Sequence, residues 1–120
     1  MEEMKLGLVE AKFAEIIWDN EPMSTKELVN LCDAQLNWKR TTTYTVLKKL
    51  CNRGIFKTEN SMIYAIVSRE QFYAIQSEKF VEETFQGSLP AFIAAFSKRK
   101  ILTHEEIEKI RQMIDSLEGE

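Results

Sequence analysis

The sequence lacks any long apolar run, because no stretch approaches the roughly 18 consecutive apolar residues of a membrane-spanning helix. Its first residues, MEEMKLG, also lack the basic, apolar and small-residue order of a secretory signal. We therefore expect a cytoplasmic protein in which Cys32 and Cys51, the only cysteines, stay reduced. Both cysteines fall within helical patterns, where packing is their expected role.

Residues that perform catalysis or bind metals are scarce as well. One histidine, His104, and two cysteines do not make a zinc-type ligand cluster. The four glycines are isolated from one another, so the sequence contains no glycine-rich phosphate loop. The acidic pairs at 82–83 and 105–106 are adjacent in sequence, so their side chains point to different helix faces. These absences predict a protein that is not an enzyme and needs no metal or cofactor.

Acidic residues are missing from one stretch, residues 36–57, although the whole chain has 19 acidic and 16 basic residues. The stretch reads LNWKRTTTYTVLKKLCNRGIFK, and its basic residues are Lys39, Arg40, Lys48, Lys49, Arg53 and Lys57. The acidic excess behind the net charge of −3 lies in residues 71–120, where six basic residues face nine acidic ones. Screening over roughly 10 Å lets the basic stretch act locally despite the negative total.

The same stretch has the periodicity of a helix with two different faces. Its apolar stripe, which can pack on a core, consists of Val46, Leu47 and Leu50. The polar residues on its other faces are Thr41, Thr42, Tyr44, Thr45 and Lys48. A helix of this kind suits the major groove of DNA, because hydroxyls reach phosphates or base edges and cations replace backbone counterions. The alternative is a solvated basic helix face.

The first half of the chain predicts three short helices. The first covers residues 6–18, with an apolar stripe of Val9, Phe13, Ile16 and Ile17. The second begins at a Ser-x-x-Glu capping box at residues 24–27, and the third covers residues 40–52. Gly54 follows the third helix, where a left-handed residue is favoured. A brief turn between the second and third helices is typical of a helix-turn-helix.

A β-hairpin is expected directly after these helices. Residues 55–58 and 62–67 are β-prone, and residues 59–61 between them favour a turn. A hairpin that follows the third helix makes a winged helix, and Phe56 can close the core. The predicted fold is therefore mainly α with a small β-hairpin, with a winged helix-turn-helix head over residues 1–68.

Residues 69–120 predict three more helices that form a dimerisation tail. Two capping boxes, at 68–71 and 103–106, and a Ser-x-Pro sequence at 88–90 predict where the helices begin. A segment of about 50 residues is too short to fold comfortably alone, so we expect a two-fold homodimer. The residues expected to form its interface are Phe72, Ile75, Phe80, Phe85, Leu89, Phe92, Ile93, Phe96, Ile107, Ile110, Ile114 and Leu117.

A dimer would present two copies of the basic helix to a palindrome, with half-sites about one DNA turn apart or a multiple of it. Four alternatives stay open. The basic helix could bind RNA or a protein partner, although the stacking aromatics of RNA-reading sheets are not evident in the sequence. The tail helices could pack on the head of the same chain. The protein could be a dimerisation or scaffold module that binds no DNA. The aromatic residues of the tail could also line a pocket for a small ligand, which would make the protein a ligand-responsive winged-helix regulator.

The ordered segments LNWKRTTTYTVLKKLCNRG, YAIVSREQF, GSLPAFIAAF and LTHEEIEKIRQMID resemble the BlaI/MecI/CopY family of bacterial penicillinase-repressor regulators. The resemblance covers nearly the whole chain. It implies a winged-helix head, a helical dimerisation tail, and repression by binding operator palindromes on double-stranded DNA. It also implies a membrane sensor-protease as a partner that triggers cleavage in the tail.

By position, Trp38 resembles the tryptophan that precedes the recognition helix of the family, with a packing role and an indole N–H available to phosphate. Thr42 and Thr45 match recognition-helix threonines. Thr41 and Tyr44 depart from the basic or long polar residues of the β-lactam branch, so the resemblance does not predict the operator sequence. Together with these five residues, the expected DNA-binding set contains Lys39, Arg40, Lys48, Lys49 and Arg53.

The tail separates two branches of the family. The copper-responsive members end in cysteine-rich metal motifs, and this chain has no cysteine after Cys51. In the β-lactam branch the tail is cut beside a phenylalanine. The matching bond here is Ala95–Phe96, where the branch carries asparagine before the phenylalanine, so cleavage at this bond is a hypothesis. The alternative is that Phe96 is a buried helix residue.

Overall fold

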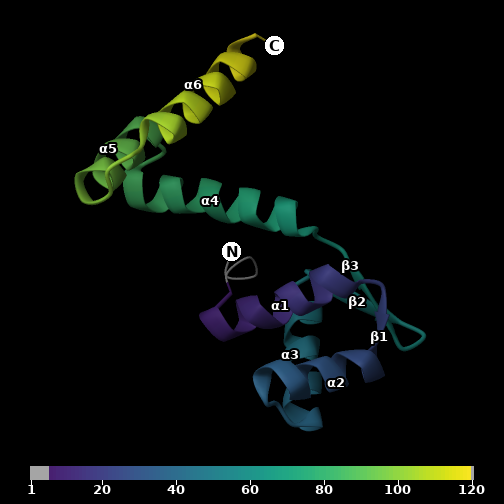
Figure 1. Ribbon diagram of the computed structural model, residues 1–120. Helices are drawn as coiled ribbons and strands as arrows, with labels where there is room; N and C mark the ends of the chain where they lie inside the picture. Colours follow the sequence, from purple (N-terminus) through teal and green to yellow (C-terminus); the bar gives the residue numbers. More distant parts are fainter. Residues whose placement is uncertain (1–5, 120) are drawn as a thin grey trace. The chain divides into compact units, whose positions relative to one another are not determined.

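The computed structural model describes residues 6–119, which form six helices and three short strands (Figure 1). In chain order the elements are α1 (Leu8–Asn20), β1 (Met23–Ser24), α2 (Thr25–Leu36), α3 (Arg40–Asn52), β2 (Phe56–Glu59), β3 (Met62–Ala65), α4 (Arg69–Phe85), α5 (Leu89–Arg99) and α6 (His104–Glu118). The chain divides into two compact units, Met1–Glu78 and Lys79–Glu120, so the division falls inside α4, ten residues beyond the boundary we expected at residue 68.

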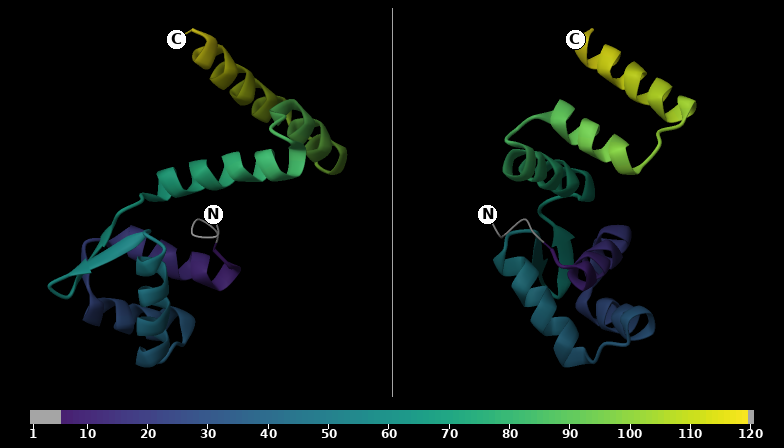
Figure 2. Two further views of the ribbon diagram at one scale, coloured as in Figure 1. Left: turned by 180° about the vertical axis from the view of Figure 1, so that it is seen from behind. Right: turned by 90° about the vertical axis from the view of Figure 1, so that its left-hand side faces the viewer.

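The first unit has the mainly α architecture with a small sheet that the sequence predicts. Its helices α1, α2 and α3 gather beside the hairpin of β2 and β3 (Figure 2). The sheet is antiparallel in the order β1-β3-β2, with Glu59 opposite Met62 across the hairpin. The two turn residues between them, Asn60 and Ser61, both have positive φ, as a tight hairpin turn matching the twist of its strands requires.

Strand β1 was not anticipated, because two residues are too short to show an alternating pattern. Met23 and Ser24 pair with Ile63 and Met62 of β3. Met23 is buried at 2% exposure, so the strand also adds an apolar side chain to the core. The segment before α2 is thereby tied to the wing.

The predicted helix ends are largely confirmed. The Ser24 hydroxyl accepts a hydrogen bond from the Glu27 amide, and the Glu27 carboxylate accepts one from the Ser24 amide, both at 3.0 Å. The equivalent boxes open α4 at Ser68 and α6 at Thr103. Gly54 has φ of +81°, as the residue after a helix C-terminus often does. The prediction for α1 was wrong by two residues at each end, since the helix covers Leu8–Asn20.

The core of the first unit lies between its helices and the sheet. Its largest fully buried side chains are Phe13, Phe56, Phe72, Ile17, Leu28, Leu50, Ile55 and Ile63. The predicted stripe of α1 is buried from Phe13 onward, but Val9 was wrongly included because it is 51% exposed. The first turn of α1 thus lies outside the packed region. Cys32 is buried as expected, and Cys51 is half-buried.

The second unit contains the end of α4 together with α5 and α6. Between residues 79 and 119 no side chain is buried. Aromatic rings form its centre, where Phe85 and Phe92 lie 5.7 Å apart and Phe80 lies 6.0 Å from each of them. None of the helices within residues 6–119 combines the length and the apolar character needed to cross a membrane.

Candidate nucleic-acid interface

Helix α3 presents one side to the core and the opposite side to solvent. Thr43, Leu47 and Leu50 are its buried residues. The polar residues predicted from periodicity are all exposed: Thr41, Thr42, Tyr44, Thr45 and Lys48. Arg40 and Lys49 of α3 are exposed as well. Val46 is half-buried against the core. The exposed side carries hydroxyls and cations, and no acidic residue lies between residues 36 and 57.

The hydroxyl groups on this face differ in what they can still offer. The Thr45 hydroxyl donates to the Thr41 carbonyl oxygen at 2.9 Å. Because a hydroxyl has one proton and two lone pairs, Thr45 presents an acceptor and a methyl group outward. Thr42 lies one turn earlier in the helix and is also exposed.

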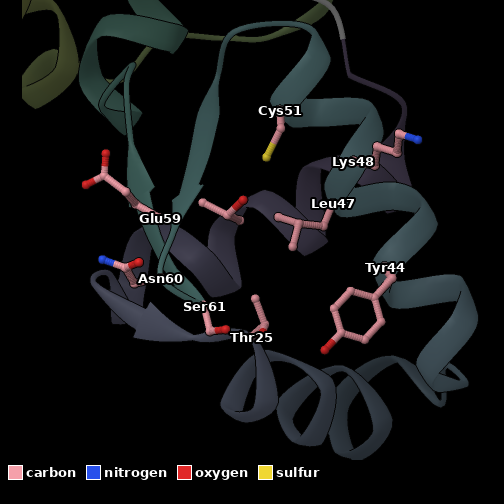
Figure 3. A pocket seen from close by; sticks show the side chains of 9 residues that line it. Thr25, Tyr44, Leu47, Lys48, Cys51, Glu59, Asn60 and Ser61 are labelled. Atoms are coloured by element: carbon pink, nitrogen blue, oxygen red, sulfur yellow. The ribbon is translucent and has the colours of Figure 1, made fainter.

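Tyr44 is oriented by its neighbours. Its ring is 37% exposed and carries the Arg40 guanidinium 5.5 Å from its centre. A hydrogen bond from the Thr25 hydroxyl lowers the pKa of Tyr44, and the nearby Arg40 charge acts in the same direction. Figure 3 shows the phenol directed toward Thr25 at the start of α2. The exposed ring edge therefore has a defined position before any ligand binds.

Lys49 and Arg53 are already engaged by an acid from another helix. The Lys49 ammonium lies 2.6 Å from one carboxylate oxygen of Glu10, and the Arg53 guanidinium lies 3.5 Å from the other. The hydrogen bond from Lys49 and one from the Gly7 amide hold the pKa of Glu10 below its ordinary value. Lys39, Arg40 and Lys48 are exposed. This pairing was not predicted from the sequence, since Glu10 lies in a different helix, far along the chain from the basic stretch.

Trp38 has the packing position that the resemblance implies. Its indole stacks on Phe13, with ring centres 5.4 Å apart and planes inclined by 25°. The side chain is half-buried against the core. Asn37, which precedes it, adopts the left-handed conformation that ends α2. The turn between α2 and α3 is therefore anchored by an aromatic contact at its second residue.

A pocket of about 520 Å³ separates α3 from the wing (Figure 3). Its lining residues are Thr25, Tyr44, Leu47, Lys48, Cys51, Thr58, Glu59, Asn60 and Ser61. Burial raises the pKa of the Cys51 thiol, which keeps it protonated. Figure 3 shows the Lys48 ammonium directed away from the pocket. The hairpin residues of this pocket were not among the site residues predicted from the sequence, because only folding brings the wing tip next to α3.

The residues expected at a dimer interface fall into three groups. Phe72 is 1% exposed and packs against Trp18 in the first unit, with ring centres 5.6 Å apart. Phe85 and Phe92 are half-buried among aromatic rings of the second unit. The other expected interface residues are exposed by 37% or more and are Ile75, Phe80, Leu89, Ile93, Phe96, Ile107, Ile110, Ile114 and Leu117.

The candidate cleavage bond, Ala95–Phe96, lies within α5. Phe96 is 46% exposed, and its ring centre lies 6.1 Å from that of Phe92. No residue of α5 is buried. Phe96 is thus not the buried helix residue of the alternative interpretation when this chain is considered alone.

The winged-helix head and the helical tail lie together in one region that matches a known protein family. A family model described as "Penicillinase repressor" matches residues 6–116, which is almost the entire chain. The chain belongs to the penicillinase repressor family. The resemblance seen in the separate sequence segments is thereby confirmed over the head and the tail together.

Individual relatives in this family are distant but span the same length. The methicillin resistance regulatory protein MecI of Staphylococcus aureus is 22% identical over 115 residues, covering 92% of this chain and 94% of its own. A penicillinase repressor of Staphylococcus aureus is 22% identical over 119 residues, covering 96% and 94%. One from Bacillus licheniformis is 21% identical over 110 residues, covering 88% and 86%.

Proposed function

We propose that this protein is a transcriptional repressor that binds palindromic operators on double-stranded DNA as a homodimer. The observation that carries the proposal is the exposed face of α3, which combines hydroxyls and cations and is held outward by its buried opposite side. Family membership and relatives named as repressors support the same function. A helix of 13 residues with this face fits the major groove, where base edges are distinguishable.

The side chains on α3 divide into base-reading and phosphate-binding groups in this proposal. Thr42 and Tyr44 read base edges, with the Tyr44 ring against a thymine methyl. Thr41 and Thr45 offer hydroxyl oxygens beside them, and Trp38 offers its indole N–H to a phosphate. The exposed cations Lys39, Arg40 and Lys48 neutralise phosphates. Lys49 and Arg53 contribute less to binding than their charge suggests, because Glu10 holds them.

The second unit supplies the dimer interface. A folded segment without any buried side chain between residues 79 and 119 leaves an apolar surface that needs a partner. A second copy of this chain is the partner that a palindrome requires, since each copy then delivers one head. The interface comprises the exposed apolar residues of the tail, with the Phe85 and Phe92 rings behind them. Phe72 is not part of it, because the head buries that ring.

Relief of repression by proteolysis in the tail is the further element of the proposal. A protease must unfold a helix before it can cleave Ala95–Phe96. No residue of α5 is buried within its own chain, so α5 should unfold readily once the dimer contacts are released. A membrane sensor-protease would be the partner that performs the cut. Incubation with such a protease and fragment mapping by mass tests this step, and intact Ala95–Phe96 after complete relief of repression would contradict it.

Selection of bound sequences from a random duplex pool tests the main proposal. The expected result is a two-fold symmetric motif whose half-sites lie about one DNA turn, or a multiple of it, apart. Sedimentation of the same sample should show a dimer. Binding should weaken steeply with salt, with a log–log slope near −0.9 per neutralised phosphate. A pool without enrichment, together with a monomer in sedimentation, would contradict DNA reading by a dimer.

A further inference from the structure

A group of side chains connects the start of α4 to α1. The polar members of this group belong neither to the core nor to the proposed DNA-binding face. The Arg69 guanidinium donates to the Glu15 carboxylate at 2.8 Å and also to Asp19. The Tyr73 hydroxyl donates to the second oxygen of Glu15 at 2.8 Å. We call Glu15, Asp19, Arg69 and Tyr73, together with Trp18, the α1–α4 brace.

Trp18 lies at the centre of the brace. Its indole N–H donates to the Val67 carbonyl oxygen at 3.0 Å, which holds the segment between the wing and α4. Its ring lies 5.6 Å from the ring of Phe72 and 6.0 Å from that of Tyr73. The Arg69 guanidinium lies 6.0 Å from the same indole. One tryptophan of α1 thus contacts both the approach to α4 and its first turn.

Electrostatics reinforces the same geometry. Hydrogen bonds to Asp19 and Glu15 raise the pKa of Arg69. The hydrogen bond to Glu15 likewise raises the pKa of Tyr73, so the phenol keeps its proton and stays a donor at physiological pH. Surface ion pairs of this type add little to folding stability. They fix an orientation instead, because two carboxylates on α1 bind one guanidinium on the first turn of α4.

From this geometry we infer that the α1–α4 brace sets the direction in which α4 leaves the DNA-reading head, and thereby which half-site spacing the dimer accepts. The inference rests on the proposed function. The first turns of α4, up to Glu78, belong to the same compact unit as α1, so the brace holds the part of α4 that leaves the head. Arg69 and Tyr73 are positioning residues, which act on DNA recognition without touching DNA.

Three variants of the full chain test the inference: Arg69→Ala, Arg69→Lys and Tyr73→Phe. Each is measured for dimerisation, for affinity to a single half-site, and for affinity to palindromes whose spacer is changed one base pair at a time. Lys12→Ala, an exposed change on α1 outside the brace, is the matched control. Arg69→Lys keeps the charge but loses the fork that spans two carboxylates.

The parent should show one sharp optimum of spacer length. Arg69→Ala should lose about tenfold in affinity at that optimum and show a flatter profile, because a loosened second head has a lower effective concentration. Tyr73→Phe should show a smaller change in the same direction. Half-site affinity and dimerisation should stay at the parent value. Variant profiles that superimpose on the parent profile, or an equal loss on half-sites, would overturn the inference.

Hydrogen exchange separates failure of the brace from failure of DNA binding. In the parent, amides of residues 73–77 should exchange slowly, and Arg69→Ala should accelerate them while those of α3 stay unchanged. Fast exchange in the parent, or no change in the variant, rejects the brace even if DNA binding is found. A parent that binds no duplex but shows protected amides rejects the proposed function, and with it the spacing role, while leaving the brace as a structural contact.

Discussion

The two units of this chain differ in how completely they bury their apolar side chains. The first buries eight large side chains almost completely, including Phe13, Phe56 and Phe72. The second, from residue 79 to 119, has helices with well-formed caps and an aromatic cluster but no buried side chain. Helices can therefore form in a segment whose own side chains form no buried core. Caps and periodicity predict the helices of the second unit, whereas its apolar side chains stay exposed in the single chain.

The largest expected effect of a substitution is a loss of folding stability in the core of the first unit, which the second unit has no counterpart for. Phe13→Ala removes a fully buried ring that also stacks on Trp38, and should lower the free energy of unfolding by about 3–5 kcal/mol. Urea unfolding followed by circular dichroism measures the change. Leu8→Ala in the same helix is the control, since Leu8 is 78% exposed and its loss should have little effect. Equal losses for both variants would refute the assigned core.

The next effect concerns the second unit. Ile110→Asp places a charge in the exposed apolar stripe of α6 and should weaken dimerisation by about 2–4 kcal/mol, as loss of an interface anchor does. Sedimentation equilibrium measures the dissociation constant. The unfolding transition of the head should not change. Lys109→Asp, on the neighbouring position of α6, is the control, and an equal loss of dimer for both variants would show that the stripe is not the interface.

A smaller effect is expected on the exposed face of α3. Thr42→Ala and Tyr44→Ala should each weaken binding to the selected operator by about 1–3 kcal/mol, because each removes a proposed base contact. Fluorescence anisotropy with operator and random duplexes measures the difference. Lys48→Ala is the contrasting variant and should weaken both duplexes equally. Unchanged operator affinity for both Thr42→Ala and Tyr44→Ala would remove α3 from the groove.

The smallest effect involves Glu10, which pairs with Lys49 and would compete with phosphates for it in the proposed complex. Glu10→Gln keeps a side chain that can accept from the Gly7 amide but removes the charge, so affinity for any duplex should rise a few-fold and the salt slope should steepen. At neutral pH the variant should be less stable by roughly 0–1 kcal/mol. Unchanged affinity and salt slope would show that Lys49 does not reach DNA.

The pH dependence of that stability difference has a definite sign. Because the folded protein holds the pKa of Glu10 below its ordinary 4.5, the ionised pair stabilises the head above that value. The contribution is lost as pH falls through the lowered pKa. Parent and Glu10→Gln should therefore converge in stability in acid, and a difference that grows as pH falls would contradict the pairing.

Much of the fold followed from local chemistry in the sequence. Helix α3 was predicted with its exact ends, and three capping boxes marked α2, α4 and α6, because caps and periodicity involve residues a few positions apart. What escaped prediction depends on residues brought together by folding. Strand β1 exists only as a partner of β3, and Glu10 meets Lys49 only after α1 packs beside α3.

The burial of Phe72 has a consequence for any shortened form of this protein. A fragment that stops at residue 68 would expose Trp18 and leave a hole in the head, whereas one that stops within α5 retains every side chain of that core. Scission at Ala95–Phe96 would accordingly release a folded DNA-binding head. Repression would then end because two heads are no longer joined, and not because either head has unfolded.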